Sequence, residues 1–270
     1  MAREERVSAL ALFSEELRQA RARAGLTQEQ VADKIGYSPS LVAHVEAGTR
    51  APSLDFARRG DAALKTGGLF ERLQPFVRRE AYPAWFRDWV DIEREATSLR
   101  SWEPLLIPGL LQTEEYARAV VAAAHPASAD GEIERLVTAR MDRQAILGRE
   151  DPPLLWVILD EGALIRPVGG AAVMRDQIDR LIVAAWQPRV VFQVVPVDAG
   201  AHPGLDGDFV IASFDGVPDV VYLNNTLAGQ VVERADDVAR IALLYDILKA
   251  EALSPRASVE LARKAIERWT

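Results

Sequence analysis

Ser40 and His44 are the two side chains whose chemistry and spacing best suit recognition of another molecule. They are four residues apart, so a helix would bring both to one face. A hydroxyl and an imidazole can hydrogen-bond the edges of DNA bases. Their neighbours on that face, Pro39 and Ala43, cannot make the bidentate contacts that discriminate strongly between bases. We therefore expect one copy of this surface to read little sequence by itself.

Two short helices joined by a tight turn, within residues 27–48, would hold this face. Thr27 is a good N-cap for the first helix, and Gln30 completes a capping box. Gly36 ends that helix, and Ser38 caps the second. Apolar residues recur at helical spacing as Val31, Ala32, Ile35, Val42 and Val45. This pattern is typical of a helix-turn-helix that reads duplex DNA.

Further helices are expected on either side of this pair. Residues 10–24 place Phe13, Leu17, Ala20 and Ala24 on one face. Ser53 would cap a later helix with Leu54, Ala57 and Leu64 inward. The intervening loop carries Arg50, a candidate for phosphate contacts, as are Arg58 and Arg59. Gly67-Gly68 is the best candidate boundary, so we predict a DNA-binding domain at 1–66, a connecting segment at 67–80 and a second domain at 81–270.

Charge and composition indicate a globular protein with two unlike parts. The chain of 270 residues is 49% hydrophobic, has a mean hydropathy of −0.03 and carries a net charge of −8. Residues 1–66 carry 10 basic and 9 acidic side chains, so the remaining residues hold all the net acidity, −9. A domain of charge +1 should bind the DNA backbone weakly, which favours a homodimer or a basic partner. No membrane span or signal peptide is expected, and the lack of cysteine fits a cytoplasmic protein.

Catalytic and metal-binding chemistry finds little support. The three histidines, His44, His125 and His202, lack metal-ligand spacing, and without cysteine we expect neither a metal site nor a cofactor. Asp160 and Glu161, at a strand end near the loop with His202, could form a hydrolytic group. No nucleophile motif accompanies them, so we do not expect an enzyme.

The loop at residues 198–208 is open to two interpretations. Gly200, His202 and Gly204 could leave it accessible to a partner peptide or a ligand, because loops often carry function. The alternative is a tight bend between two strands.

The second half of the chain predicts an α/β domain with a mixed sheet flanked by helices. Strands are expected at 97–104, 154–161, 189–197, 207–214 and 218–225. A helix at 169–187 would make a crossover between two of them, and Asp215-Gly216 is a hairpin signal. Further helices are expected at 113–124, 131–149, 235–253 and 254–269. The aromatic cluster around Trp85 and Trp89 is expected in the core, the alternative being a platform for stacked bases.

Residues 12–66 resemble the lambda-repressor-like helix-turn-helix domain of the xenobiotic-response-element regulators. The matching residues are Gly25, Leu26, Thr27, Gln28, Ala32, Gly36, Ser38, Val42, Val45, Glu46 and Gly48. The resemblance implies an all-α domain of about five helices in which Gln28 touches a phosphate. It also implies that Ser38, Pro39, Ser40, Ala43 and His44 face the major groove. Arg21 and Glu46 would form a partly buried structural ion pair.

The rest of the chain resembles the actinomycete regulators of the WhiJ type. The match rests on Trp85-Phe86, Ser101-Trp102-Glu103, residues 108–113, Tyr116, residues 140–144, Asp160-Glu161, residues 200–204 and residues 219–222. The resemblance implies a transcriptional regulator that works with a small partner protein in an antitoxin-like or developmental module. The alternatives are a repressor whose C-terminal domain senses a small molecule, and an enzyme tethered to DNA.

Overall fold

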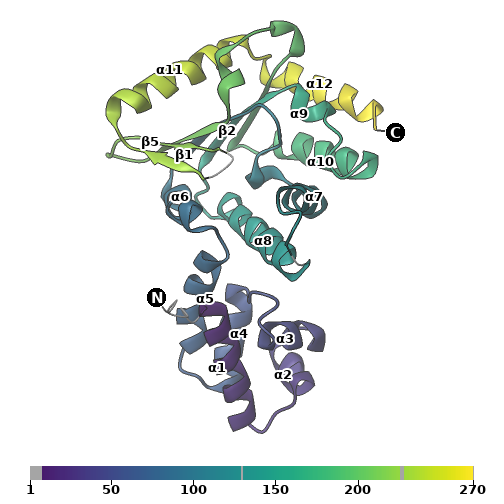
Figure 1. The fold of residues 1–270 in the computed structure, drawn as a ribbon, viewed down its shortest axis with the longest axis vertical. Helices are drawn as coiled ribbons and strands as arrows, with labels where there is room; N and C mark the ends of the chain where they lie inside the picture. Colours follow the sequence, from purple (N-terminus) through teal and green to yellow (C-terminus); the bar gives the residue numbers. More distant parts are fainter. Residues whose placement is uncertain (1–7, 129, 226–227, 270) are drawn as a thin grey trace. The chain divides into compact units, whose positions relative to one another are not determined.

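The computed structural model describes residues 8–128, 130–225 and 228–269. The chain forms two compact units, one helical and one built on a sheet (Figure 1). The helical unit consists of residues 1–87 and 125–142, and the sheet unit consists of residues 88–124 and 143–270. Helices α6 (Ala84–Glu95) and α8 (Asp130–Arg143) each contain residues of both units. The predicted layout, a helical domain followed by an α/β domain with a mixed sheet, is confirmed.

Five successive helices form the main body of the helical unit. They are α1 (Ala9–Arg23), α2 (Gln28–Ile35), α3 (Pro39–Glu46), α4 (Leu54–Leu64) and α5 (Leu69–Glu80). Their apolar faces meet in one core whose fully buried members include Phe13, Val31, Val42, Phe56 and Phe70. The rings of Phe13 and Phe70 lie 5.1 Å apart between centroids, which joins α5 to α1.

Two sequence expectations for this unit differ from the structure. Residues 67–80, expected as a connecting segment, largely form α5, whose Phe70 and Val77 belong to the core. Leu54, expected to face inward, is 39% exposed, whereas Phe56 is buried. Leu54 is the first residue after the Ser53 cap, and the phase of α4 from that point turns Phe56 toward the core.

The sheet unit is built on six strands. They are β1 (Ser98–Glu103), β2 (Leu154–Asp160), β3 (Val190–Val195), β4 (Phe209–Ser213), β5 (Val220–Leu223) and β6 (Gln230–Val232). Its helices include α7 (Glu114–Ala124), α9 (Gly162–Ile165), α10 (Ala171–Ala184), α11 (Ala235–Glu251) and α12 (Pro255–Glu267). Short 3₁₀ helices are η1 (Gly109–Leu111), η2 (Gln144–Gly148), η3 (Val197–Ala199) and η4 (Pro203–Asp206).

The strand order is β3-β2-β1-β4-β5-β6. β1, β2 and β3 are parallel, and α10 makes the crossover from β2 to β3 that the sequence predicted. β4, β5 and β6 are antiparallel additions, with Ile211 opposite Val221 across the predicted hairpin. The sequence did not predict β6. It has only three residues, too few to show an alternating pattern.

Helices cover both faces of the sheet (Figure 1). On one face, Val238, Tyr245 and Leu248 of α11 pack on strand residues that include Trp102 and Ile211. On the other face, Trp89 of α6 stacks on Tyr222 of β5 with ring centroids 4.9 Å apart. Trp89 is therefore a core residue, as expected. Its ring stacks on Tyr222 and not on a base.

A buried ion pair lies beside this stacked pair. Glu93 of α6 is 3.0 Å from the Arg143 guanidinium, and both side chains are almost fully buried. Burial raises the pKa of the Glu93 carboxyl above its ordinary value, and the charge of Arg143 opposes that rise. Burial also raises the pKa of the Tyr222 hydroxyl, so this phenol stays protonated.

The outer edge of β3 is closed by the last part of the chain. Ser258 of α12 accepts a hydrogen bond from Val194 N–H through its hydroxyl oxygen at 2.9 Å. Leu253 N–H donates to the Val194 carbonyl at 2.8 Å. The N–H and the carbonyl of Val194 are therefore both hydrogen-bonded, although they lie at an edge of the sheet where backbone groups are otherwise free.

Candidate nucleic-acid interface

The N-terminus of α2 is fixed by a reciprocal pair of hydrogen bonds. Thr27 Oγ1 accepts from Gln30 N–H at 3.2 Å, and Gln30 Oε1 accepts from Thr27 N–H at 2.9 Å. The predicted capping box is thus confirmed. The Thr27 hydroxyl serves the helix itself, so it is a positioning group for whatever α2 contacts.

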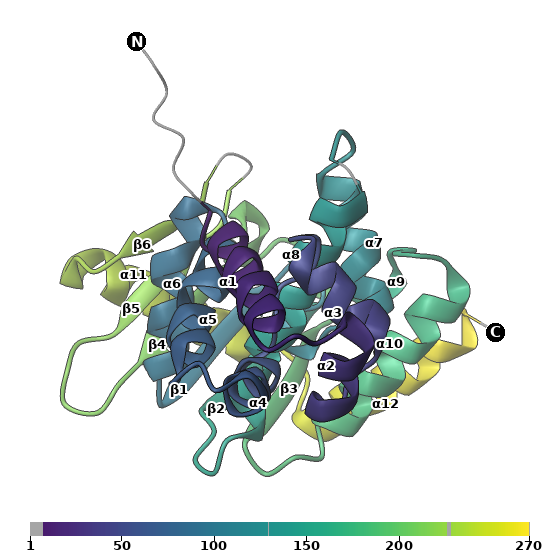
Figure 2. The same cartoon turned by 90° about the horizontal axis from the view of Figure 1, so that it is seen from below.

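Gly36 makes the turn between α2 and α3, which lie side by side (Figure 1 and Figure 2). Its φ of 72° and ψ of 36° are left-handed values that glycine adopts without steric cost. Ser38 Oγ then accepts from Leu41 N–H at 3.2 Å and caps α3, whose first residue is Pro39. Local chemistry alone therefore sets the start of the second helix.

α3 has a buried side and an exposed side, as the sequence predicted. Val42 and Val45 are fully buried. Ser38, Pro39, Ser40 and His44 are exposed and Ala43 is half-buried. The exposed side carries no formal charge, because its only titratable group is the His44 imidazole.

Thr49, which the sequence reasoning missed, holds the His44 ring. The Thr49 hydroxyl donates to the His44 carbonyl at 3.1 Å and lies 3.0 Å from His44 Nδ1. A hydroxyl has one hydrogen, so with that hydrogen on the carbonyl its oxygen accepts from Nδ1–H. In this arrangement the other ring nitrogen, Nε2, is the acceptor of a neutral imidazole, suited to the amino groups of adenine or cytosine.

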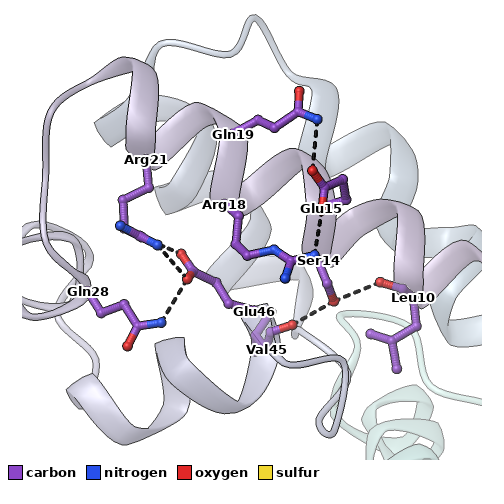
Figure 3. Close-up of polar contacts among 9 residues, drawn as sticks. All are labelled: Leu10, Ser14, Glu15, Arg18, Gln19, Arg21, Gln28, Val45 and Glu46. Atoms are coloured by element: carbon purple, nitrogen blue, oxygen red, sulfur yellow. Dashed lines mark hydrogen bonds and ion pairs between the residues drawn. The ribbon is translucent and has the colours of Figure 1, made fainter.

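Arg21 and Glu46 form the ion pair that the resemblance implied (Figure 3). Arg21 Nε and Nη2 donate to the two Glu46 carboxylate oxygens at 2.6 and 2.9 Å. The Glu46 side chain is 2% exposed and the Arg21 side chain 22%. Donating these hydrogen bonds to Glu46 raises the pKa of Arg21, so the arginine stays charged. The pair ties α1 to the C-terminal end of α3.

Gln28, predicted to touch a phosphate, is engaged within the protein (Figure 3). Its Nε2 donates to Glu46 Oε2 at 2.8 Å, so the amide completes the shell around the buried carboxylate. Ser14 of α1 adds a second link between α1 and α3. Its hydroxyl lies 2.6 Å from the Val45 carbonyl of α3 and 2.8 Å from the Leu10 carbonyl of α1. Sequence reasoning did not single out Ser14, although a serine within an apolar stripe was a visible signal.

The three candidate phosphate-binding arginines have different surroundings. Arg58 pairs with Glu71 at 2.8 Å, and Arg59 pairs with Asp55 at 2.8 Å. Arg50 is exposed in the loop after α3 and has no such ion pair within the described residues. Burial raises the pKa of the Asp142 carboxyl, and the charges of Arg78 and Arg50 oppose that rise, so Arg50 interacts with this carboxylate at longer range than an ion pair. It is therefore the candidate that breaks no close ion pair to reach DNA.

The loop at residues 198–208 is anchored to the sheet unit. The side chain of His202 is 4% exposed, with Nε2 3.4 Å from Asp160 Oδ2 and its ring edge-on to Trp102. The Gly204 carbonyl accepts from Trp102 Nε1 at 2.8 Å, and a Cβ on Gly204 would lie 2.4 Å from that ring. Two of the three predicted loop residues thus pack inside the unit, whereas Gly200 is exposed.

The described residues contain neither a membrane span nor a metal cluster. No helix there is long and apolar enough to cross a membrane. Within the same residues, no group of three or more histidine and acidic side chains is arranged to hold a metal ion.

The fold and this surface define a helix-turn-helix protein, a class that binds DNA through the exposed side of its second helix. Residues 12–73 match the family model of a helix-turn-helix domain. Residues 86–264 match the model described as Domain of unknown function (DUF5753), so the chain belongs to the family that carries this domain. No curated protein and no solved structure matched the chain. The helix-turn-helix domain suggests a DNA-binding regulator.

Proposed function

We propose that the protein is a sequence-specific transcriptional regulator of the xenobiotic-response-element class, related to the WhiJ type, and not an enzyme. One observation carries the proposal. α3 presents Ser40 and an oriented His44 on an exposed, uncharged side, while Arg21, Glu46 and Gln28 lock the helix from behind. A rigid helix with few polar groups at its surface suits the major groove.

Two copies would act together on DNA. Only Ser40 and His44 offer hydrogen bonds to bases, and residues 1–66 carry a net charge of only +1. A homodimer on two half-sites would double both the base contacts and the phosphate contacts. Arg50 and the backbone N–H groups at the start of α2 are the proposed phosphate contacts, since helix N-termini bind anions.

The test is fluorescence anisotropy with labelled duplex DNA from upstream of the gene for this chain, at several salt concentrations. Arg50→Ala should weaken binding to all sequences and lower the salt slope by about 1. Ser40→Ala and His44→Ala should each cost about 1 kcal/mol and change the preference among sequences. Thr49→Val should mimic the loss of preference, because it frees the His44 ring.

Arg18→Ala is the matched control, because Arg18 is exposed on α1 and pairs with Glu15. It should leave DNA binding unchanged. Equal binding by the native chain and by the Ser40, His44 and Arg50 variants would refute the assignment of the reading face.

We further propose that a small partner protein controls the regulator through its C-terminal domain and that the protein acts in the cytoplasm. A partner that binds only the folded state stabilises it by an amount that grows with the logarithm of the partner concentration, and so raises the unfolding temperature. Stabilisation by a co-purified small protein would support this control. Stabilisation by metabolite extracts alone would favour the alternative, a repressor that senses a small molecule.

A further inference from the structure

The helical unit has a second surface of unusual composition, an open groove of about 640 Å³. Its lining residues come from α1, α2, α4, α5 and two connections, and none comes from α3. Its apolar floor is formed by Ala20, Ala24, Leu26, Ala63, Leu64 and Leu69. Arg23, Lys34 and Lys65 are the charged lining residues. We call this surface the basic groove.

The three cations of the basic groove have no carboxylate of their own. Within the described residues, Arg23, Lys34 and Lys65 form no ion pair. Two acids belong to the same helix ends. Asp61 accepts hydrogen bonds from the Thr66 hydroxyl, which lines the groove, and from the Phe70 and Glu71 N–H groups at 3.0 and 2.8 Å, so it keeps its negative charge beside the groove without an ion pair. Glu71 pairs with Arg58. The groove therefore concentrates positive charge over an apolar floor.

Helix dipoles neutralise only part of this charge. Arg23 is the last residue of α1, Lys34 lies in the last turn of α2, and Lys65 is the C-cap of α4. Each helix C-terminus acts as about half a negative charge. Three such ends offset about half of the three positive charges. The Asp61 carboxylate, hydrogen-bonded to the lining residue Thr66, offsets one more, so the groove keeps a small excess of roughly +0.5 for a ligand.

The backbone conformation of Lys65 is a second indication that its charge is needed in the groove. Its φ of 53° and ψ of 46° make it the single non-glycine residue with positive φ in the part of the chain that the structure describes. Glycine adopts these angles without steric cost and is the common residue at this place in a helix end. A lysine here keeps a cation at the rim of the groove in a conformation that is unfavourable for it.

We propose that the basic groove binds an acidic, amphipathic segment of a partner protein. Leucine-like side chains of that segment would cover the alanine and leucine floor, and its carboxylates would reach the three cations. DNA is the less suitable occupant, because phosphates would leave the apolar floor uncovered. None of the lining residues belongs to α3, so the segment need not cover the exposed side of that helix.

The test uses the full chain and a fluorescein-labelled helical peptide with a repeated Leu-Glu-Glu-Leu sequence as probe. The same peptide with glutamine in place of glutamate is the charge control. We expect the acidic peptide to bind and the glutamine peptide to bind much more weakly. Lys34→Met and Lys65→Gly should each weaken binding about two- to fivefold, whereas Arg18→Met, on α1 outside the groove, should not.

Lys65→Gly separates binding from stability. Because glycine relieves the left-handed conformation, this variant should unfold at an equal or higher urea concentration while it binds the peptide less well. Equal binding of the two peptides would overturn the proposal. The proposal would also be overturned if the groove variants lost stability but still bound the peptide. In that case the cations would serve only to stabilise the helix ends. Loss of DNA binding as strong as that of Arg50→Ala would place the groove in the DNA interface and would also overturn it.

Discussion

Replacement of Arg21 by alanine tests whether the Arg21–Glu46 ion pair stabilises the position of α3. The change removes both hydrogen bonds to Glu46, whose side chain is 2% exposed, and leaves that carboxylate with the Gln28 amide. Breaking a fully buried ion pair by removal of one partner costs about 3–5 kcal/mol. Arg21 is 22% exposed and Gln28 still donates, so we expect a loss of about 2–3 kcal/mol in the free energy of unfolding.

The assay is urea denaturation of the full chain, followed by two signals. Circular dichroism reports the helices. Tryptophan fluorescence reports little on α1 to α4, because all six tryptophans occur at residue 85 or later. Arg21→Ala should move the part of the circular dichroism transition that belongs to the helical unit, and the fluorescence transition should move little. Hydrogen exchange on peptides from α1 and α3 should show faster opening.

Two comparisons decide the interpretation. Arg18→Ala removes an exposed pair with Glu15 from the same helix and should leave both transitions in place. The double variant Arg21→Ala with Glu46→Gln should regain part of the lost stability, because no charge is then buried alone. The reasoning is refuted if Arg21→Ala costs no more than Arg18→Ala, or if Glu46→Gln restores nothing.

Two further predictions concern the sheet unit. Gly204→Ala should cost about 1–3 kcal/mol and alter the near-ultraviolet dichroism of Trp102, since its Cβ would lie 2.4 Å from that ring. Gly148→Ala, which meets nothing within 4 Å, should be silent, and equal effects of the two would contradict the packing account. The buried Glu93 carboxyl, opposite Arg143, has a raised pKa, so its contribution to stability is complete below the ordinary glutamate value and is lost as pH rises through the folded-state value. Urea midpoints of the native chain relative to Glu93→Gln should therefore fall as pH rises above about 4.3, and a difference independent of pH would disprove it.

The α2–α3 pair could be predicted because its determinants are local. Thr27 and Ser38 cap helices within three residues of themselves, and Gly36 supplies the left-handed turn from its own conformation. The buried strands β2 and β3 could also be predicted from the sequence, because continuous apolar runs mark them.

The features that sequence could not supply depend on distant partners. The bond from Gln28 to Glu46 spans 18 positions, and only the packed arrangement of α1, α2 and α3 brings these groups together. Phe56 belongs to the buried core of the helical unit, and its ring lies 5.3 Å from that of Tyr37, a contact 19 positions away that the sequence did not indicate. Gly67-Gly68 suggested a domain boundary followed by a connection, yet residues after it form α5, whose Phe70 and Val77 pack in the core of the helical unit.

The closing of the β3 edge has a consequence for how the protein is made. Ser258 and Leu253 satisfy the backbone of Val194 only once the final helices have been synthesised and have folded back. Until then a nascent chain presents a bare, apolar strand, the kind of edge that recruits other strands. A premature stop codon ahead of Ser254 would therefore leave this strand edge unpaired and favour aggregation or proteolysis of the shortened chain.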